Sequence, residues 1–272
     1  MLHHLDLPVI AECDVVVVGA SVRAVAAAAA ASESGARVFL AGPRLYAGED
    51  LCSTLRLWLA AGESPAGSLT EAIFRGERWT TPLNVKKTLE RALTDAGVTF
   101  RLGCLASEMI ADTFGRLAGV VVAARGGRGA VLAPCVIDAS ERAVLARCAG
   151  IAFRRRHAGQ ELPAATRVVI AEQGRVAARR LVSPVLDEDA AFFEYEIPLR
   201  RVDCESFPAF ALAEQAARDR TYVAGELRGA EKLSVVPDEA VSGVRRAADG
   251  AFSGGELSGV EREDQVREHP EH

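Results

Sequence analysis

The hydrophobic pattern is most regular near the start of the chain. Residues 14–19 form a continuous β-branched run that ends in glycine, which is typical of a strand buried on both faces of a parallel sheet. Residues 22–33 are almost all alanine and valine and predict a helix that packs closely on a sheet, with Gly35 as its stop. Residues 37–41 return as a second apolar strand. Together these segments predict a right-handed β-α-β unit.

Two further helices are indicated by their start signals. Ser68 and Glu71 fit a capping box ahead of an apolar segment. Thr81-Pro82 places a cap and a first-turn proline ahead of a helix whose buried face carries Leu89 and Leu93.

A run of strands follows this helix. Residues 98–105 are expected to form one strand, and turns at Gly115 and Gly126-Gly127 predict an antiparallel meander over about 107–133. Residues 131–137 then form a strand, after which Asp138-Ala139-Ser140 opens another helix.

The second half of the chain is less regular. Strands are expected at 167–171 and 192–199 and a helix at 207–218. The pattern predicts an α/β protein with a Rossmann-like nucleotide domain at 12–150 and a small second domain at 151–252, whose completeness stays open. Residues 221–250 are candidates for a return to the first domain, and residues 253–272 read as a flexible tail.

Composition narrows the classes of partner. The net charge of −5 comes from 37 acidic and 32 basic residues without a basic stripe, so a nucleic-acid partner is not expected. The longest apolar run is shorter than the roughly 20 residues of a membrane span, and no secretion signal opens the chain. We therefore expect a cytoplasmic protein that acts on a small molecule, alone, as a homo-oligomer or with a partner subunit.

A glycine motif stands between the first strand and its helix. Residues Gly19-Ala20-Ser21-Val22-Arg23-Ala24 follow the pattern G-x-G-x-x-A except at Ser21, which replaces the middle glycine. A side chain there narrows the approach of a pyrophosphate but adds a hydrogen-bonding group. Gly42 stands where an acid usually accepts hydrogen bonds from a ribose. The alternative is a β-α-β unit that serves folding alone.

The order of these segments resembles the FAD-dependent oxidoreductases that have a glutathione-reductase-like nucleotide domain. The similarity extends over residues 40–51, 97–106, 115–122 and 136–140, and covers about 12–150 in all. It implies FAD as the cofactor, with the adenosine near Arg44 and Ala106 and the pyrophosphate on the helix N-terminus. The implied cofactor-binding residues are Gly19, Ala20, Ser21, Val22, Arg23, Ala24, Arg44, Gly48, Glu49, Asp50, Ala106, Asp138, Ala139 and Ser140.

The resemblance also implies a later strand ending in glycine and an acid that contact the flavin. Residues 221–226 are the candidate, which adds Gly225 and Glu226 to the predicted site. Pro237 and Gly243 interrupt the helix that should follow over 232–248.

Other reactive residues have simpler interpretations. Cys52 would be a flavin-adjacent thiol if it were exposed with a lowered pKa, but free cysteines are more often structural. The chain has no C-x-x-C pair and no Tyr-x-x-x-Lys pair, which disfavours dithiol reductases and short-chain dehydrogenases. His157, after three arginines, is expected on a solvated face. No metal site and no catalytic residue are assigned.

Three functional hypotheses remain. The first is an FAD-dependent oxidoreductase in which a hydride passes from a small-molecule substrate to the flavin. The second is a flavin-free structural or regulatory subunit that keeps the fold and completes a partner chain. The third, an NAD-binding module, lacks the ribose acid and any dehydrogenase motif.

Overall fold

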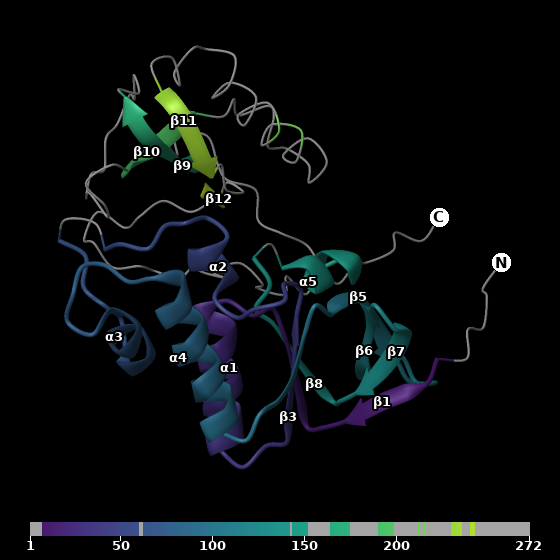
Figure 1. Ribbon diagram of the computed structural model, residues 1–272. Coiled ribbons are helices and arrows are strands. Elements are labelled where there is room, and N and C mark those ends of the chain that lie inside the picture. Colours follow the sequence, from purple (N-terminus) through teal and green to yellow (C-terminus); the bar gives the residue numbers. More distant parts are fainter. Residues whose placement is uncertain are drawn as a thin grey trace, which may run out of the picture.

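The computed structural model describes residues 7–59, 62–141, 143–151, 164–174, 190–198, 230–235 and 240–242, together with 212 and 215 (Figure 1). The first 151 residues contain a parallel sheet, an antiparallel sheet and five helices within the described ranges. A third sheet is formed by later strands.

The parallel sheet has four strands in the order β4-β3-β2-β8. Its strands are β2 (Val15–Val18), β3 (Val38–Gly42), β4 (Thr99–Leu102) and β8 (Cys135–Asp138). Val15 pairs with Val38 on one side and with Cys135 on the other, and all these pairings are parallel. All four strands therefore end at one carboxyl edge, where the turns after β2 and β8 lie side by side.

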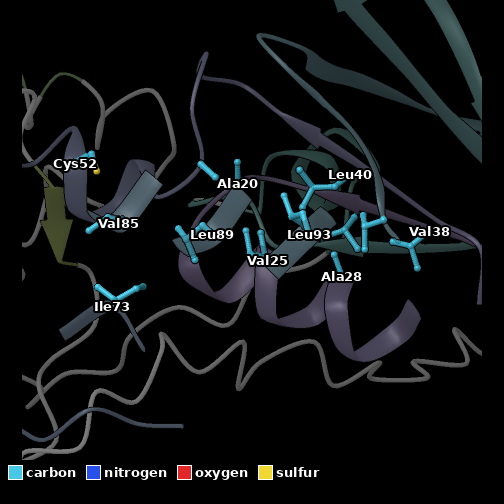
Figure 2. Packing of buried hydrophobic residues seen from close by; sticks show 14 of the residues in the cluster. Ala20, Val25, Ala28, Val38, Leu40, Cys52, Ile73, Val85, Leu89 and Leu93 are labelled. Atoms are coloured by element: carbon cyan, nitrogen blue, oxygen red, sulfur yellow. The ribbon is translucent and has the colours of Figure 1, made fainter. Parts of the chain in front are cut away.

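Helices cover one face of this sheet (Figure 1). These helices are α1 (Val22–Glu33) and α4 (Pro82–Asp95), with α2 (Glu49–Cys52) and α3 (Ser68–Phe74) packed against them. The fifth helix, α5 (Val144–Cys148), packs against β5 instead, and its Leu145 belongs to the core on the other side of the sheet. Figure 2 shows the core that α1 and α4 share with the sheet, in which Val25, Leu40 and Leu89 are fully buried. The predicted β-α-β unit and the α4 cap are confirmed, because Thr81 accepts a hydrogen bond from Asn84 N at 3.2 Å.

An antiparallel meander covers the other face. Its strands β5 (Leu105–Ala111), β6 (Leu117–Ala124) and β7 (Gly127–Leu132) are joined by β1 (Val9–Glu12), which pairs with β7 in parallel. A second core lies between the two sheets and contains Val16, Val18 and Phe39. Val17 points instead to the helices. Alternate residues of β2 thus serve two cores, which explains its uninterrupted apolar run.

Four local predictions were wrong in detail. Ser68 is not an N-cap, since Gly67 holds that place and makes no side-chain hydrogen bond. The strand expected over 98–105 is divided at Gly103, which has a φ of +68°. The strand expected over 131–137 is two strands in different sheets, separated by Ala133 and Pro134. The helix after Asp138 begins only at Val144. In the two divided strands the chain changes layers within a run that looks continuous in sequence.

The later strands form a separate sheet in the order β10-β9-β11, with β12 also paired to β9. They are β9 (Ala164–Gly174), β10 (Ala190–Pro198), β11 (Ala230–Val235) and β12 (Ala240–Ser242), and all pairings are antiparallel. Two of these strands match the segments predicted at 167–171 and 192–199. The expected tail at 253–272 lies outside the described residues, as does most of 207–218. Within the described residues no helix is long and apolar enough to cross a membrane.

Candidate functional site

The turn after β2 depends on a glycine. Gly19 has a φ of +114°, a conformation that residues with a side chain rarely adopt. A Cβ at this position would lie 2.7 Å from the carbonyl oxygen of Ala139, in the turn after β8. Ala139 N also donates to Val18 O at 2.9 Å. The structure thus brings the two predicted segments, 19–24 and 138–140, into direct contact.

Ser21, which replaces the middle glycine of the motif, caps α1. Its Oγ accepts a hydrogen bond from Ala24 N at 3.2 Å, and the residue is buried. A cap of this kind satisfies one of the N–H groups that a helix start leaves unpaired. The hydroxyl is therefore folded onto its own helix.

Two carboxylates from α2 cover the remaining part of this turn. Glu49 Oε1 accepts from Ala20 N at 3.2 Å, and the two carboxylate oxygens of Asp50 lie 3.2 and 3.3 Å from Val22 N. Together with Ser21, these side chains place oxygen atoms on the N–H groups of residues 20, 22 and 24. Negative charge at a helix N-terminus is stabilised by the helix dipole, so the carboxylates stand where an anion would bind.

Gly48 fixes α2 beside the turn. Its N–H donates to Ala20 O at 2.7 Å, and its φ is +85°. A Cβ there would lie 2.5 Å from Val85 and 2.9 Å from Leu89, both on α4. The absence of a side chain at Gly48 therefore lets the backbone of α2 approach both the turn and α4.

The two carboxyl groups are held in an environment that disfavours their charge. Burial raises the pKa of Glu49, against the hydrogen bond from Ala20 N, while Asp50 and Glu141 add repulsion. Burial likewise raises the pKa of Asp50, to about 6, although the hydrogen bond from Val22 N and the charge of Arg23 oppose this. Asp50 thus titrates near neutral pH rather than near its usual value of about 3.9.

The turn after β8 has its own acid. Asp138 Oδ1 accepts from Ser140 N at 3.1 Å and from Ser140 Oγ at 2.5 Å, and Oδ2 accepts from Ala146 N at 2.9 Å. Ser140 Oγ in turn accepts from Val144 N at 2.8 Å. Asp138 therefore joins the end of β8 to α5, and its oxygens are used within the turn.

The residues predicted to lie near the adenosine are placed at the neighbouring strand ends. Arg44 is exposed, and its carbonyl accepts from Gly103 N at 2.7 Å, which ties the loop after β3 to the connection between β4 and β5. Ala106 is at the start of β5 and packs against the core beneath the meander. Their contact with a nucleotide stays a prediction.

The structure also explains why no acid stands at residue 42. A Cβ on Gly42 would lie 2.7 Å from the Ala20 side chain and 2.8 Å from Leu102. Any side chain would therefore push β3 away from the glycine turn or from β4. The close packing of Gly42 against Ala20 therefore leaves no space for an acidic side chain that could bind a ribose.

The structure tests the reactivity predicted for Cys52 but not the predicted role of Gly225 and Glu226. Cys52 is buried, its thiol lies 3.7 Å from Pro82 O, and burial raises its pKa to about 11. It is a packing residue rather than a reactive thiol. Gly225 and Glu226 lie outside the described residues, so their role stays a prediction.

Sequence reasoning placed Glu49 and Asp50 among the cofactor ligands but missed their partners. The N–H groups they hold are 28 and 29 residues away, and nothing in the local pattern predicts such pairs. The available signal was two adjacent acids directly after a glycine, at the point where the chain passes the glycine turn.

Comparison with known proteins adds a family match and several similar folds. The family model described as FAD dependent oxidoreductase matches residues 14–225. No curated protein sequence matches the chain significantly.

Three solved structures illustrate the similarity of fold. OxyS anhydrotetracycline hydroxylase from Streptomyces rimosus is 14% identical with a TM-score of 0.50, and the match covers 85% of this chain and 52% of that one. CabE, an aromatic hydroxylase from angucycline biosynthesis, is 16% identical with a TM-score of 0.52 over 88% and 56%. A geranylgeranyl bacteriochlorophyll reductase-like protein from Thermoplasma acidophilum is 15% identical with a TM-score of 0.52 over 85% and 66%. The chain thus spans about half to two thirds of their lengths.

Proposed function

Because the chain belongs to the family of FAD-dependent oxidoreductases, whose cofactor is FAD, we propose that it oxidises a small-molecule substrate by hydride transfer to bound flavin. The cofactor would lie along the carboxyl edge of the parallel sheet, across the turns after β2 and β8. This is the edge at which open α/β sheets bind their ligands.

The observation that carries the proposal is the row of backbone donors at the start of α1. The N–H groups of Ala20, Val22 and Ala24 hold side-chain oxygens from Glu49, Asp50 and Ser21. A diphosphate offers the same kind of acceptor, with negative charge that suits a helix N-terminus. The donor set therefore fits FAD, provided that the carboxylates yield their places.

The other predicted contacts surround this row. Arg44 would lie near the adenosine, and Asp138, Ala139 and Ser140 would line the opposite turn, which already touches Gly19. FAD supplies the two-electron acceptor for the reaction. The chain's own residues would bind and orient it.

The names of two similar structures indicate hydroxylation in those proteins, but identity of 14–16% supports the fold alone. The substrate of this chain therefore stays at the level of a small molecule. The flavin-free subunit considered from the sequence is not favoured by the family match.

The test is a visible absorption spectrum of the purified full chain, taken before and after addition of excess FAD and gel filtration. Flavin bands that elute with the protein support the proposal, and anaerobic bleaching by candidate substrates would then identify the hydride donor. A folded chain that stays colourless after both steps would contradict it. Circular dichroism distinguishes this result from misfolding.

A further inference from the structure

The carboxylates of Glu49 and Asp50 occupy the donors that an incoming diphosphate needs. Val22 N lies 3.2 Å from one oxygen of Asp50 and 3.3 Å from the other, so this carboxylate covers the N–H group with both oxygens. Glu49 covers Ala20 N in the same way with one oxygen. A diphosphate at this position would meet two negative charges within hydrogen-bonding distance of its own oxygens.

Asp50 cannot move far from this place. Its carbonyl accepts a hydrogen bond from Thr54 Oγ1 at 2.8 Å, and the start of α2 is tied to the glycine turn by Gly48 N and Ala20 O. Cys52 N donates to Gly48 O at 2.8 Å and anchors the same helix. Since an aspartate side chain is short, a fixed backbone keeps its carboxyl group near Val22 N, so a diphosphate that takes this N–H group still has the Asp50 carboxyl group as its neighbour.

The charged groups that face Asp50 come from three elements. Arg23 on α1 favours its ionised form, and Glu141 in the turn after β8 opposes it. Glu49, its neighbour on α2, is affected by Arg44 from the loop after β3 as well as by Glu141. The basic residues, Arg23 and Arg44, are both exposed, whereas Glu49 and Asp50 are half-buried. Solvent screens the arginine charges more than the charges of the two acids.

We propose that FAD binds to the start of α1 together with a proton, which is taken up by the carboxyl group of Asp50. The neutral carboxyl group no longer repels the diphosphate, and its O–H can donate a hydrogen bond to a phosphate oxygen. Asp50 is then a ligand that makes cofactor binding depend on pH. This inference rests on the proposed function, because it requires FAD to bind at this edge.

The chemical balance is simple. One proton passes from solvent to an Asp50 carboxylate oxygen as FAD binds, and no covalent bond of the cofactor changes. Because burial already raises the pKa of Asp50 to about 6, the proton is taken up easily near neutral pH. A nearby diphosphate raises that pKa further through like-charge repulsion.

The experiment measures the Kd of FAD for the full chain from about pH 5.5 to about pH 8.5, together with proton uptake in buffers of different ionisation enthalpy. Wild-type binding is expected to weaken by up to about tenfold per pH unit above about pH 6, the limit for uptake of one proton. Asp50→Asn, which mimics the neutral carboxyl group, is expected to have a clearly shallower pH dependence, because only Glu49 still titrates at these donors, and to bind at least about tenfold more tightly near pH 8.

Glu33→Gln is the matched control, since it removes one exposed charge at the opposite end of α1. It should keep the wild-type slope, because its charge is distant from the turn. Proton uptake by the wild-type chain tests the inference without any variant, so a poorly folded Asp50→Asn protein would not remove the test.

The possible outcomes separate this inference from the proposed function. FAD binding with the same Kd at every pH, or without proton uptake, overturns the role of Asp50 and leaves the flavoprotein assignment in place. An Asp50→Asn variant that keeps the wild-type slope overturns it as well. A folded wild-type chain and variant that both fail to bind FAD at any pH overturn the proposed function and this inference with it.

Discussion

Two turns at the carboxyl edge of the parallel sheet satisfy their backbone donors in different ways. After β8, Asp138 accepts from residues two and eight positions further along the chain. After β2, the acids that serve Ala20 and Val22 arrive from α2, 28 and 29 residues away. The first turn is closed by its own sequence, whereas the second depends on side chains from α2, with which the proposed FAD diphosphate would compete. The comparison teaches that one edge can hold an acid that serves its own turn beside acids supplied by a distant segment.

The largest expected effect comes from breaking the contact between the two turns. Gly19→Ala would place a Cβ 2.7 Å from Ala139 O with φ at +114°, and neither backbone can give way easily. We expect a loss of about 3 kcal/mol or more in the free energy of unfolding, measured by urea denaturation. Gly35→Ala is the control, since its φ is +93° but nothing lies within 4 Å, and its cost should be about 1 kcal/mol. Equal losses would show that the turn-to-turn contact is unimportant.

The second largest effect is expected at Asp138, which serves its own turn. Asp138→Ala removes the acceptor of two hydrogen bonds from Ser140 and of one from Ala146 N on α5, and should cost about 2 kcal/mol, measured by thermal unfolding. Asp112→Ala is a matched loss of a turn acid that accepts from Phe114 N and Arg116 N on the exposed meander. It should cost less than about 1 kcal/mol, because solvent replaces those bonds. An Asp138→Ala variant as stable as wild type would contradict the structural role.

Asp50 should make the stability of the FAD-free protein depend on pH. Since the pKa of Asp50 is raised to about 6 in the folded state, that state binds more protons than the unfolded chain below this pH. Its contribution is complete below the unfolded pKa of about 4 and is lost as pH rises through about 6. We expect wild type to lose about 1 to 2 kcal/mol relative to Asp50→Asn between about pH 4.5 and pH 7. Parallel urea-denaturation profiles for the two proteins would refute this.

The smallest effect concerns Ser21. Because its Oγ caps α1, Ser21→Ala should cost about 1 kcal/mol and Ser21→Gly only a few tenths, measured by thermal unfolding. Ser21→Gly should leave the Kd of FAD nearly unchanged, since Ser21 holds only Ala24 N, whereas the carboxylates cover Ala20 N and Val22 N. A large gain in FAD affinity would show instead that steric crowding at Ser21 limits binding.

The glycine motif and the first β-α-β unit could be predicted because their signals are local. An apolar run, a glycine, a small-residue helix and a second run follow each other within 30 residues, and the structure places them as expected. The same holds for the Thr81 cap of α4. The divided strands at 98–105 and 131–137 could not be predicted, because a change of layer leaves the apolar pattern intact.

The candidate site, too, was predicted from the sequence only in part. The sequence by itself determined which residues line the edge of the sheet, since strand ends and glycine turns are written in neighbouring positions. Only the tertiary structure decided that Gly42 has no space for an acid, and that Glu49 and Asp50 hold the N–H groups of Ala20 and Val22. The reason is physical: these contacts join segments that are distant along the chain, and their burial, which raises the pKa of Asp50, exists only once α2 is packed against the turn.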